Sequence, residues 1–473
     1  MIFFLLYIYI NMQKKQKSSH KHQQENTFRQ KKQRSGVITT HSKNSNNNEN
    51  DTKIVYLDNN ATTFMPKFVI NHMISWMNKG NPSSSYDSSV RCKEKIQEAK
   101  KDIAKYCNIG DDYYIILNSG ATEGNANILR SAMEGYRCKM KIKPHLIISA
   151  IEHKSILETA KNLESLGEIF LTLIQPDILG FIHPHDVEHE IRNNTALISI
   201  MAANNETGTI NNIKAIGEIA HKHNVPFHTD YTQLFGKKPA QPNKENIDAF
   251  TMSFHKLHGP PGIGALVIKK DFWEGFGMKP LIAGTQNDGM RGGTECMPNI
   301  AGAHAALLYT LHNRYEKNQE LLRKKIFLLN ELKKHIPCKT IEQYWKEKEF
   351  NLYRNVVEVV FISGDLDNID KYLYNTIMLS VVKRTKPYIC NIFIKKMLEK
   401  KGIIVSIGSA CNTQSKNASH VVEAMRFDDL LKKGVLRISM CDDTTIDDLK
   451  KFILNFLMII KFCVNTKFDP ESY

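Results

Sequence analysis

The run Ser253-Phe254-His255-Lys256-Leu257-His258-Gly259-Pro260-Pro261-Gly262-Ile263-Gly264 places a lysine at the end of an apolar, strand-like segment. A Gly/Pro-rich turn follows at once and is too tight for a helix or strand to continue. Burial at a strand end can depress the pKa of a lysine and free its amine for Schiff-base chemistry. Taken alone, such a lysine is more often solvated. The interpretation of Lys256 therefore depends on partners elsewhere in the chain.

Strand-like and helix-like segments alternate along the chain ahead of Lys256. We expect strands at 113–117, 145–150, 169–174, 196–201, 225–229, 249–254 and 263–268, and helices at 122–134, 154–166, 186–192 and 213–223. One apolar stripe also predicts a helix through Ile96, Ala99, Ile103 and Tyr106. This alternation indicates an α/β fold in which helices cover both faces of a mostly parallel sheet.

The pattern changes after residue 299, where one long helical stretch is expected to run to about Lys334. Shorter strands and helices follow, as is typical of a second, smaller α+β domain. The predicted divisions are a disordered basic extension over 1–53, a large domain over 54–310 and a small C-terminal domain over 311–473. Residues 54–66 are expected to pack near the small domain.

Composition and charge narrow the class of protein. The chain is 42% hydrophobic and 24% charged, as in ordinary globular proteins. Residues 1–53 hold ten Lys/Arg against three Asp/Glu, and the rest shows no basic stripe typical of a nucleic-acid surface. The apolar runs 1–10 and 453–460 are too short to span a membrane. Nine cysteines without a CxxC pair favour a reducing compartment, so we expect a cytoplasmic location, with mitochondrial import as the alternative, and no metal site.

Two groups of residues lie where a strand passes into a helix. The small-residue turn 118–124 exposes backbone N–H groups at a helix start and, with the Thr122 hydroxyl, suits a phosphate. His153 begins the next helix. It is either an ordinary first-turn histidine or an imidazole that stacks on a planar cofactor and transfers protons.

Further polar residues follow later strands, at the edge where open α/β sheets bind ligands. The run 204–208 follows one strand, and Asp230 and Gln233 follow the next. Asp230 can keep a ring nitrogen protonated and Gln233 can donate to a ring oxygen, although a lone strand-end Asp is usually a helix N-cap. Together with Lys256, these are the parts of a pyridoxal 5′-phosphate site: anion cradle, ring platform, ring-nitrogen partner and lysine.

These features resemble the NifS-type cysteine desulfurases, pyridoxal-phosphate enzymes of fold type I in aminotransferase class V. The resemblance covers about residues 54–310 and 400–450. Its motifs are Leu57-Asp58-Asn59-Asn60-Ala61-Thr62-Thr63, Ser119-Gly120-Ala121-Thr122-Glu123, Glu152-His153-Lys154, Asn204-Asn205-Glu206, Asp230-Tyr231-Thr232-Gln233, His255-Lys256, Met290-Arg291-Gly292-Gly293-Thr294 and Gly408-Ser409-Ala410-Cys411. Gly292 departs from the family pattern, which has serine before Gly-Thr.

The resemblance implies a role for each site residue. Lys256, His153 and Cys411 are the expected catalytic residues, with Cys411 as the nucleophile on a mobile loop. The residues expected to hold the cofactor are Ala121, Thr122, Ser253 and His255 at the phosphate, Thr294 from the partner subunit, and Asn205, Asp230 and Gln233 at the ring. Arg437 and Asn60 are expected to bind the substrate.

The implied activity converts L-cysteine to L-alanine in a homodimer and leaves sulfur as a persulfide on Cys411. A sulfur-acceptor or scaffold protein would then receive it, for iron–sulfur cluster assembly or tRNA thiolation. Selenocysteine lysis and another class-V reaction such as transamination are the alternatives among enzymes, and Cys411 opposes only transamination. The alternative outside the enzymes is a relic that binds the cofactor without catalysing a reaction. The retention of Lys256, Cys411 and Arg437 opposes this alternative.

Overall fold

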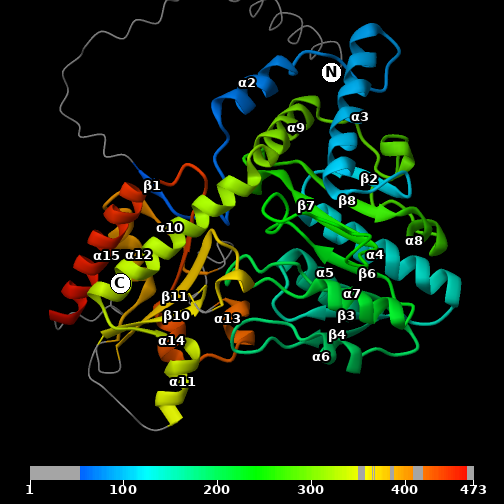
Figure 1. Ribbon diagram of the computed structural model, residues 1–473. Helices are drawn as coiled ribbons and strands as arrows, with labels where there is room; N and C mark the ends of the chain where they lie inside the picture. Colours follow the sequence, from blue (N-terminus) through cyan, green and yellow to red (C-terminus); the bar gives the residue numbers. More distant parts are fainter. Residues whose placement is uncertain are drawn as a thin grey trace, which may run out of the picture. The chain divides into compact units, whose positions relative to one another are not determined.

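The structure is a computed structural model (Figure 1). It describes residues 54–349, 357–364, 366, 368–383, 388–408 and 419–465. The predicted extension 1–53 and the predicted nucleophile Cys411 lie outside these residues. All described residues belong to one compact unit, and a domain boundary near residue 310 stays a prediction.

A seven-stranded sheet forms the centre of the N-terminal half of the described chain. In spatial order its strands are β2 (Tyr113–Asn118), β8 (Gly264–Lys269), β7 (Ala249–Ser253), β6 (Phe227–Asp230), β5 (Thr195–Ser199), β3 (His145–Ser149) and β4 (Phe170–Ile174). β8 runs antiparallel to both of its neighbours, and every other pairing is parallel. The predicted mostly parallel α/β sheet is therefore confirmed, with each strand within two residues of its expected ends.

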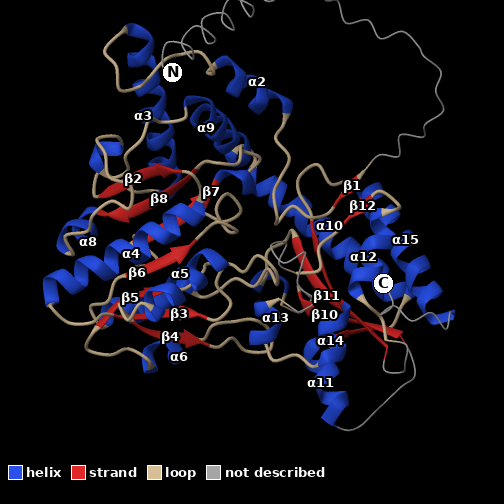
Figure 2. Cartoon of the chain, turned by 180° about the vertical axis from the view of Figure 1, so that it is seen from behind, coloured by secondary structure: helices blue, strands red, loops and turns tan. Residues whose placement is uncertain are grey.

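Helices cover both faces of this sheet (Figure 2). One face packs against α4 (Ala121–Met140) and α5 (Lys154–Ser165). The other packs against α3 (Asp87–Cys107), α7 (Ile213–Lys222) and α9 (Met297–Leu311). The apolar stripe predicted for α3 buries Ile96, Ala99 and Ile103. The remaining helices of this half are α2 (Lys67–Ser75), α6 (Pro184–His189) and α8 (Lys270–Gly275).

A second sheet has the order β13 (Val435–Ser439), β11 (Thr376–Lys383), β10 (Val357–Ser363) and β9 (Cys338–Thr340). α10 (Arg314–His335), α12 (Asn391–Glu399) and α15 (Ile446–Asn465) pack on it around a separate apolar core. Short helices α11 (Ile341–Glu349), α13 (His420–Ala424) and α14 (Asp429–Gly434) complete this half. β1 (Val55–Tyr56) pairs with β12 (Ile403–Ile404), so the start of the described chain joins the C-terminal core.

The single long helix expected to reach Lys334 is wrong. The structure has two helices there, α9 and α10, because His312 is extended and Asn313 adopts a left-handed conformation with φ of 51°. The predicted helix 186–192 also begins and ends earlier, as α6. Among the described residues, none of the helices combines the length and hydropathy needed to cross a bilayer.

Candidate active site

Lys256 ends a single 3₁₀ turn, η1 (Phe254–Lys256), directly after β7. The Nζ atom of Lys256 donates to the carbonyl oxygens of Asn60 at 2.7 Å and Ala61 at 2.5 Å. The motif 57–63 thus lies directly against the lysine turn, although almost 200 residues separate them in the sequence. Thr63 strengthens the same contact, since its hydroxyl donates to the His255 carbonyl and accepts from the His258 N–H.

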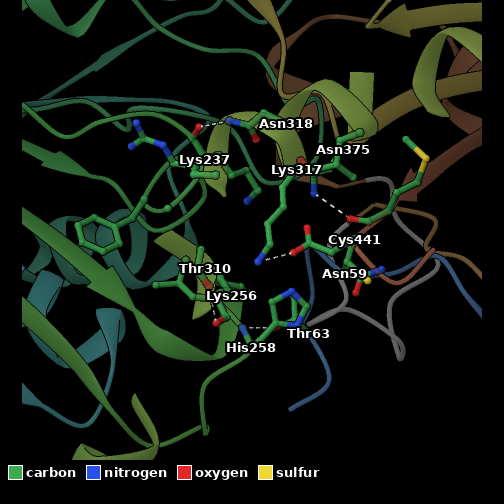
Figure 3. A pocket seen from close by; sticks show the side chains of 17 residues that line it. Asn59, Thr63, Lys237, Lys256, His258, Thr310, Lys317, Asn318, Asn375 and Cys441 are labelled. Atoms are coloured by element: carbon green, nitrogen blue, oxygen red, sulfur yellow. Dashed lines mark hydrogen bonds and ion pairs between the residues drawn. The ribbon is translucent and has the colours of Figure 1, made fainter. Parts of the chain in front are cut away.

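The environment of Lys256 favours the neutral amine. Burial lowers its pKa to about 7, and the nearby cations Arg437 and Lys237 add repulsion. Lys256 also lines a cavity of about 50 Å³ (Figure 3). An amine with a near-neutral pKa can act as a nucleophile or exchange protons near physiological pH.

The predicted anion cradle is the turn before α4. Gly120 has φ of 141°, a conformation that glycine tolerates and other residues rarely adopt. α4 begins at Ala121, so the N–H groups of Ala121 and Thr122 have no intrahelical acceptor. The Ser253 hydroxyl faces this turn, at 3.6 Å from the position a Gly120 Cβ would take. Helix start and strand end therefore converge as an anion site requires.

His255 directly precedes Lys256 in the η1 turn. Its Nδ1 lies 3.2 Å from the Thr62 hydroxyl. Burial lowers the pKa of His255 to about 4, with repulsion from Lys256 as the next cause. The imidazole is therefore neutral at physiological pH and can donate one hydrogen bond while it accepts another.

His153 is both a helix cap and an available base. Its Nδ1 accepts from the Ser155 N–H at 3.2 Å and lies 2.8 Å from the Ser155 hydroxyl. These contacts orient the ring at the start of α5 and leave Nε2 for other partners. Burial lowers the pKa of His153, so the ring is neutral near pH 7. The first-turn interpretation and the functional interpretation of His153 are thus compatible.

Asp230 lies at the end of β6 with its carboxylate held from two sides. Oδ2 accepts from the Asn125 side chain at 2.8 Å, and Oδ1 accepts from the Thr232 N–H at 2.9 Å. Gln233 donates to the Asn60 carbonyl at 3.1 Å. Its Oε1 is buried and has no partner among the described residues. An unpartnered buried oxygen indicates that a polar group completes this site.

Arg437, on β13, is 1% exposed. It donates to Asp58 Oδ1 at 2.5 Å and to the Asn205 carbonyl at 3.0 Å. In the described part of the chain, its Nε is buried without an acceptor. The Asp58 contact fixes the plane of the guanidinium, and Nε remains free to bind a carboxylate.

The Asn60 side chain forms hydrogen bonds with three other residues of the site. Its amide donates to the Asn205 carbonyl and the Thr376 hydroxyl, and its Oδ1 accepts from Asn375. Asn205 contributes its carbonyl oxygen to both Asn60 and Arg437. Asn60 and Asn205, both predicted site residues, therefore contact each other, and Asn60 connects the segment after β5 to β11.

Two predicted site residues remain to be located. Thr294 is exposed, three residues after Arg291. Cys411 lies outside the described residues, between Gly408 and Ser419. Both of those flanking residues contact Glu206: the Ser419 hydroxyl donates to its Oε2 at 2.6 Å, and a Cβ on Gly408 would lie 3.2 Å from the same oxygen.

Sequence reasoning missed Asn125 and the partner role of Asp58. Asn125 is fully buried and donates to both Asp230 and the Ser155 hydroxyl. The available signal was an amide one turn into α4, on the side opposite to Glu123, Arg130, Glu134 and Arg137. Glu206 was recognised only as part of a motif, and no local pattern connects it with Ser419.

Glu152, beside His153, is fully buried, and burial raises its pKa to about 8. Its Oε1 accepts from the Ser149 hydroxyl at 2.5 Å and the Met201 N–H at 2.8 Å. The folded carboxyl therefore keeps a proton that the unfolded chain loses above pH 4.5, so this group contributes less stability as pH rises from about 5 to 8.

Glu152→Gln keeps the acceptor oxygen and removes the titration. We expect its stability, relative to the unmodified protein, to improve steadily from pH 5 to pH 8. Thermal unfolding midpoints of both proteins at pH 5, 6.5 and 8 test this. A difference that stays constant with pH would contradict the protonated state of Glu152.

Residues 55–452 match the class-V aminotransferase family. A cysteine desulfurase IscS from Methanosarcina thermophila is 34% identical over 419 residues, which is 88% of this chain and 94% of the relative. The chain belongs to the cysteine desulfurases of that family.

Two solved structures agree with the fold. A NifS-like protein is 30% identical with a TM-score of 0.72 and covers 87% of this chain and 100% of its own. SspA in complex with cysteine is 31% identical with a TM-score of 0.63 and covers 82% of this chain and 99% of its own. Both confirm the predicted fold of pyridoxal-phosphate enzymes of fold type I.

Cysteine desulfurases of this family are pyridoxal-phosphate enzymes, and the residues present fit that group. The Gly120 turn and Ser253 offer donors to a phosphate, Asp230 offers a carboxylate to a protonated ring nitrogen, and Lys256 offers an amine with a depressed pKa. Oε1 of Gln233, which has no partner among the residues that the structure describes, belongs to the same set of groups.

Proposed function

We propose that this protein is a cysteine desulfurase that converts L-cysteine and the Cys411 thiol to L-alanine and a Cys411 persulfide. One observation carries the proposal: Lys256, Gln233 and Arg437 come from separate strands or strand ends and each contacts residues 58–60. Asp230, three residues before Gln233, is close enough for its charge to act on Lys256. The 34% identity to a cysteine desulfurase over most of the chain supports the same reaction.

Pyridoxal phosphate would be held by the 119–122 turn, Ser253 and His255 at its phosphate, and by His153, Asn205, Asp230 and Gln233 at its ring. When bound to Lys256, it supplies an electron sink for bonds broken at the amino acid. Asp230 favours that role because its carboxylate, fixed by Asn125 and Thr232, stabilises positive charge on the ring.

The protein's own groups perform the remaining work. Arg437, oriented by Asp58, binds the α-carboxylate of L-cysteine. Lys256, with a pKa near 7, accepts the substrate Cα proton and returns a proton to the product. The Cys411 thiolate attacks Sγ of the substrate: the new S–S bond forms as the Cβ–Sγ bond breaks, and no external oxidant or reductant is needed.

The direct test is product analysis. Purified holoenzyme given L-cysteine and a thiol reductant should release L-alanine and sulfide in equal amounts. Without reductant, the protein should gain one sulfur atom in mass, located on the Cys411 peptide. Transamination would instead give a keto acid. If no product formed, the protein would be a relic of the fold without catalytic activity.

A homodimer with shared sites is part of the proposal. Five apolar side chains on and beside α2 are 40–64% exposed: Phe64, Phe68, Ile70, Ile74 and Met77. Several exposed apolar side chains within one short segment are typical of a protein interface. The exposed Thr294 is available to a second copy of the chain, as the family pattern implies.

Shared sites predict complementation between two inactive variants. Thr294→Ala and Lys256→Ala homodimers should each have little activity, whereas their heterodimer keeps one site with both residues intact. We expect it to recover a substantial part of the activity, up to about half, because one of two sites is complete. Steady-state rates of tagged, co-purified heterodimers measure this, and activity equal to the parent variants' would contradict sharing.

A further inference from the structure

An ion pair ties the phosphate turn to the segment that leads to Thr294. Arg291 Nε donates to Glu123 Oε1 at 2.8 Å, and its second nitrogen donates to Oε2 at 3.1 Å. The same Oε2 accepts from the Ser119 N–H at 2.9 Å. Glu123 therefore joins Arg291 to the first residue of the cradle through charge-assisted bonds of fixed geometry.

The pair is shielded, since the side chains of Arg291 and Glu123 are 22% and 12% exposed. The carboxylate is stabilised, because the hydrogen bonds from Arg291 and Ser119 lower the pKa of Glu123 against the opposing effect of burial. The Arg291–Glu123 pair is also bidentate, which distinguishes it from mobile surface ion pairs that contribute little to stability.

The segment around Arg291 is fastened to the rest of the subunit. Asn287 exchanges hydrogen bonds with the N–H and carbonyl of Leu117, on the edge strand β2. A Cβ on Gly292 would lie 2.1 Å from the Ala283 carbonyl oxygen, so the backbone packs closer than serine allows. This close approach explains why glycine stands here in place of the family's serine. Thr294, two residues after Gly292, therefore follows a segment that is held firmly against the rest of the subunit.

We infer that Glu123 and Arg291 are positioning residues that hold Thr294 in place for the partner subunit's cofactor. The inference rests on the proposed function, because it needs a dimer with shared sites. Only one residue separates Glu123 from Ala121 in the cradle, and only two separate Arg291 from Thr294. The Glu123–Arg291 pair therefore connects the phosphate turn of one subunit, over a short distance in sequence, to the Thr294 that contacts the cofactor of the partner subunit.

The two possible roles of the pair differ in which subunit they affect. If Arg291 only stabilises its own phosphate turn, its loss weakens cofactor binding in the same subunit. If it positions Thr294, its loss weakens the site of the partner subunit. A heterodimer with one reporting site separates these effects.

In the test heterodimer, the reporter subunit keeps Lys256 and the donor subunit carries Lys256→Ala. Only the reporter can then retain cofactor through a borohydride-reducible bond. Arg291→Lys is placed in the donor alone, the reporter alone, or neither, and the holoprotein is diluted for timed intervals before reduction. Mass spectrometry of the reporter gives the rate of cofactor loss, which needs no turnover.

We expect Arg291→Lys in the donor to speed cofactor loss from the reporter about tenfold, within the usual range for coupled sites. Glu123→Gln in the donor should speed cofactor loss by a similar factor. The two changes together should be hardly faster than either alone, because each removes the same interaction. Glu320→Gln is the matched control. Its partner Arg323 forms a similar fork, with both distances 2.8 Å, on the exposed surface of α10, and it should leave the rate unchanged.

Loss of cofactor only when Arg291→Lys is in the reporter would overturn the inference, and so would unchanged rates in every arrangement. Both outcomes leave the proposed function standing. A parent heterodimer that holds no reducible cofactor would instead refute the proposed function, and the inference with it.

Discussion

Cys411→Ser should bind cofactor and L-cysteine normally, yet form alanine at least about a thousandfold more slowly than the unmodified protein. The hydroxyl of serine stays protonated near neutrality, so it cannot replace a thiolate as the acceptor of sulfur. Lys256, Asp230 and Arg437 remain in place, and the spectral change on adding L-cysteine should therefore persist. Alanine formation and the visible spectrum, measured on the same sample, separate binding from turnover.

Cys441→Ser is the matched control for that experiment. Cys441 lines the cavity next to Lys256, and burial raises the pKa of its thiol. A protonated, partly buried thiol is a poor nucleophile, so this variant should keep most of the activity. Near-normal turnover by Cys411→Ser would refute the proposed sulfur transfer even with the fold correct.

Lys256→Ala should abolish both the covalent attachment of the cofactor and turnover, with a rate loss of at least about a thousandfold. The Lys256 side chain has two proposed roles: its amine binds the cofactor covalently, and it transfers the substrate proton. Water in its place could transfer protons but could not bind the cofactor covalently. Borohydride reduction followed by peptide mapping should label Lys256 in the unmodified protein and no lysine in the variant.

Lys237 provides the control because it lines the same cavity and burial lowers its pKa to about 8. Its Nζ is directed to the Gln233 carbonyl at 2.6 Å rather than to residues 60 and 61. Lys237→Ala should therefore keep a reducible bond at Lys256. A label on Lys237 in the unmodified protein or in Lys256→Ala would transfer the proposed role to that lysine.

Local pattern predicted the sheet and much of the site. All seven strands of the large sheet follow from apolar runs between polar turns, because a strand buried on both faces needs continuous apolar residues. Lys256, His153 and Asp230 were recognisable since each follows a strand, where α/β sheets bind ligands. The boundary between α9 and α10 was not recognisable, because Asn313 sits inside an uninterrupted helical pattern.

The sequence by itself determined the order of strands and helices through the large sheet, the lysine turn and the motifs that indicate the family. These properties depend on neighbouring residues, whose preferences and spacing can be read along the chain. Only the tertiary structure decided that Asp58 orients Arg437, that Asn125 holds Asp230, and that Glu123 joins the cradle to Arg291. Each contact joins residues more than 100 positions apart. Such contacts exist because packing the core brings distant strand ends together, and no local propensity encodes which polar groups then meet.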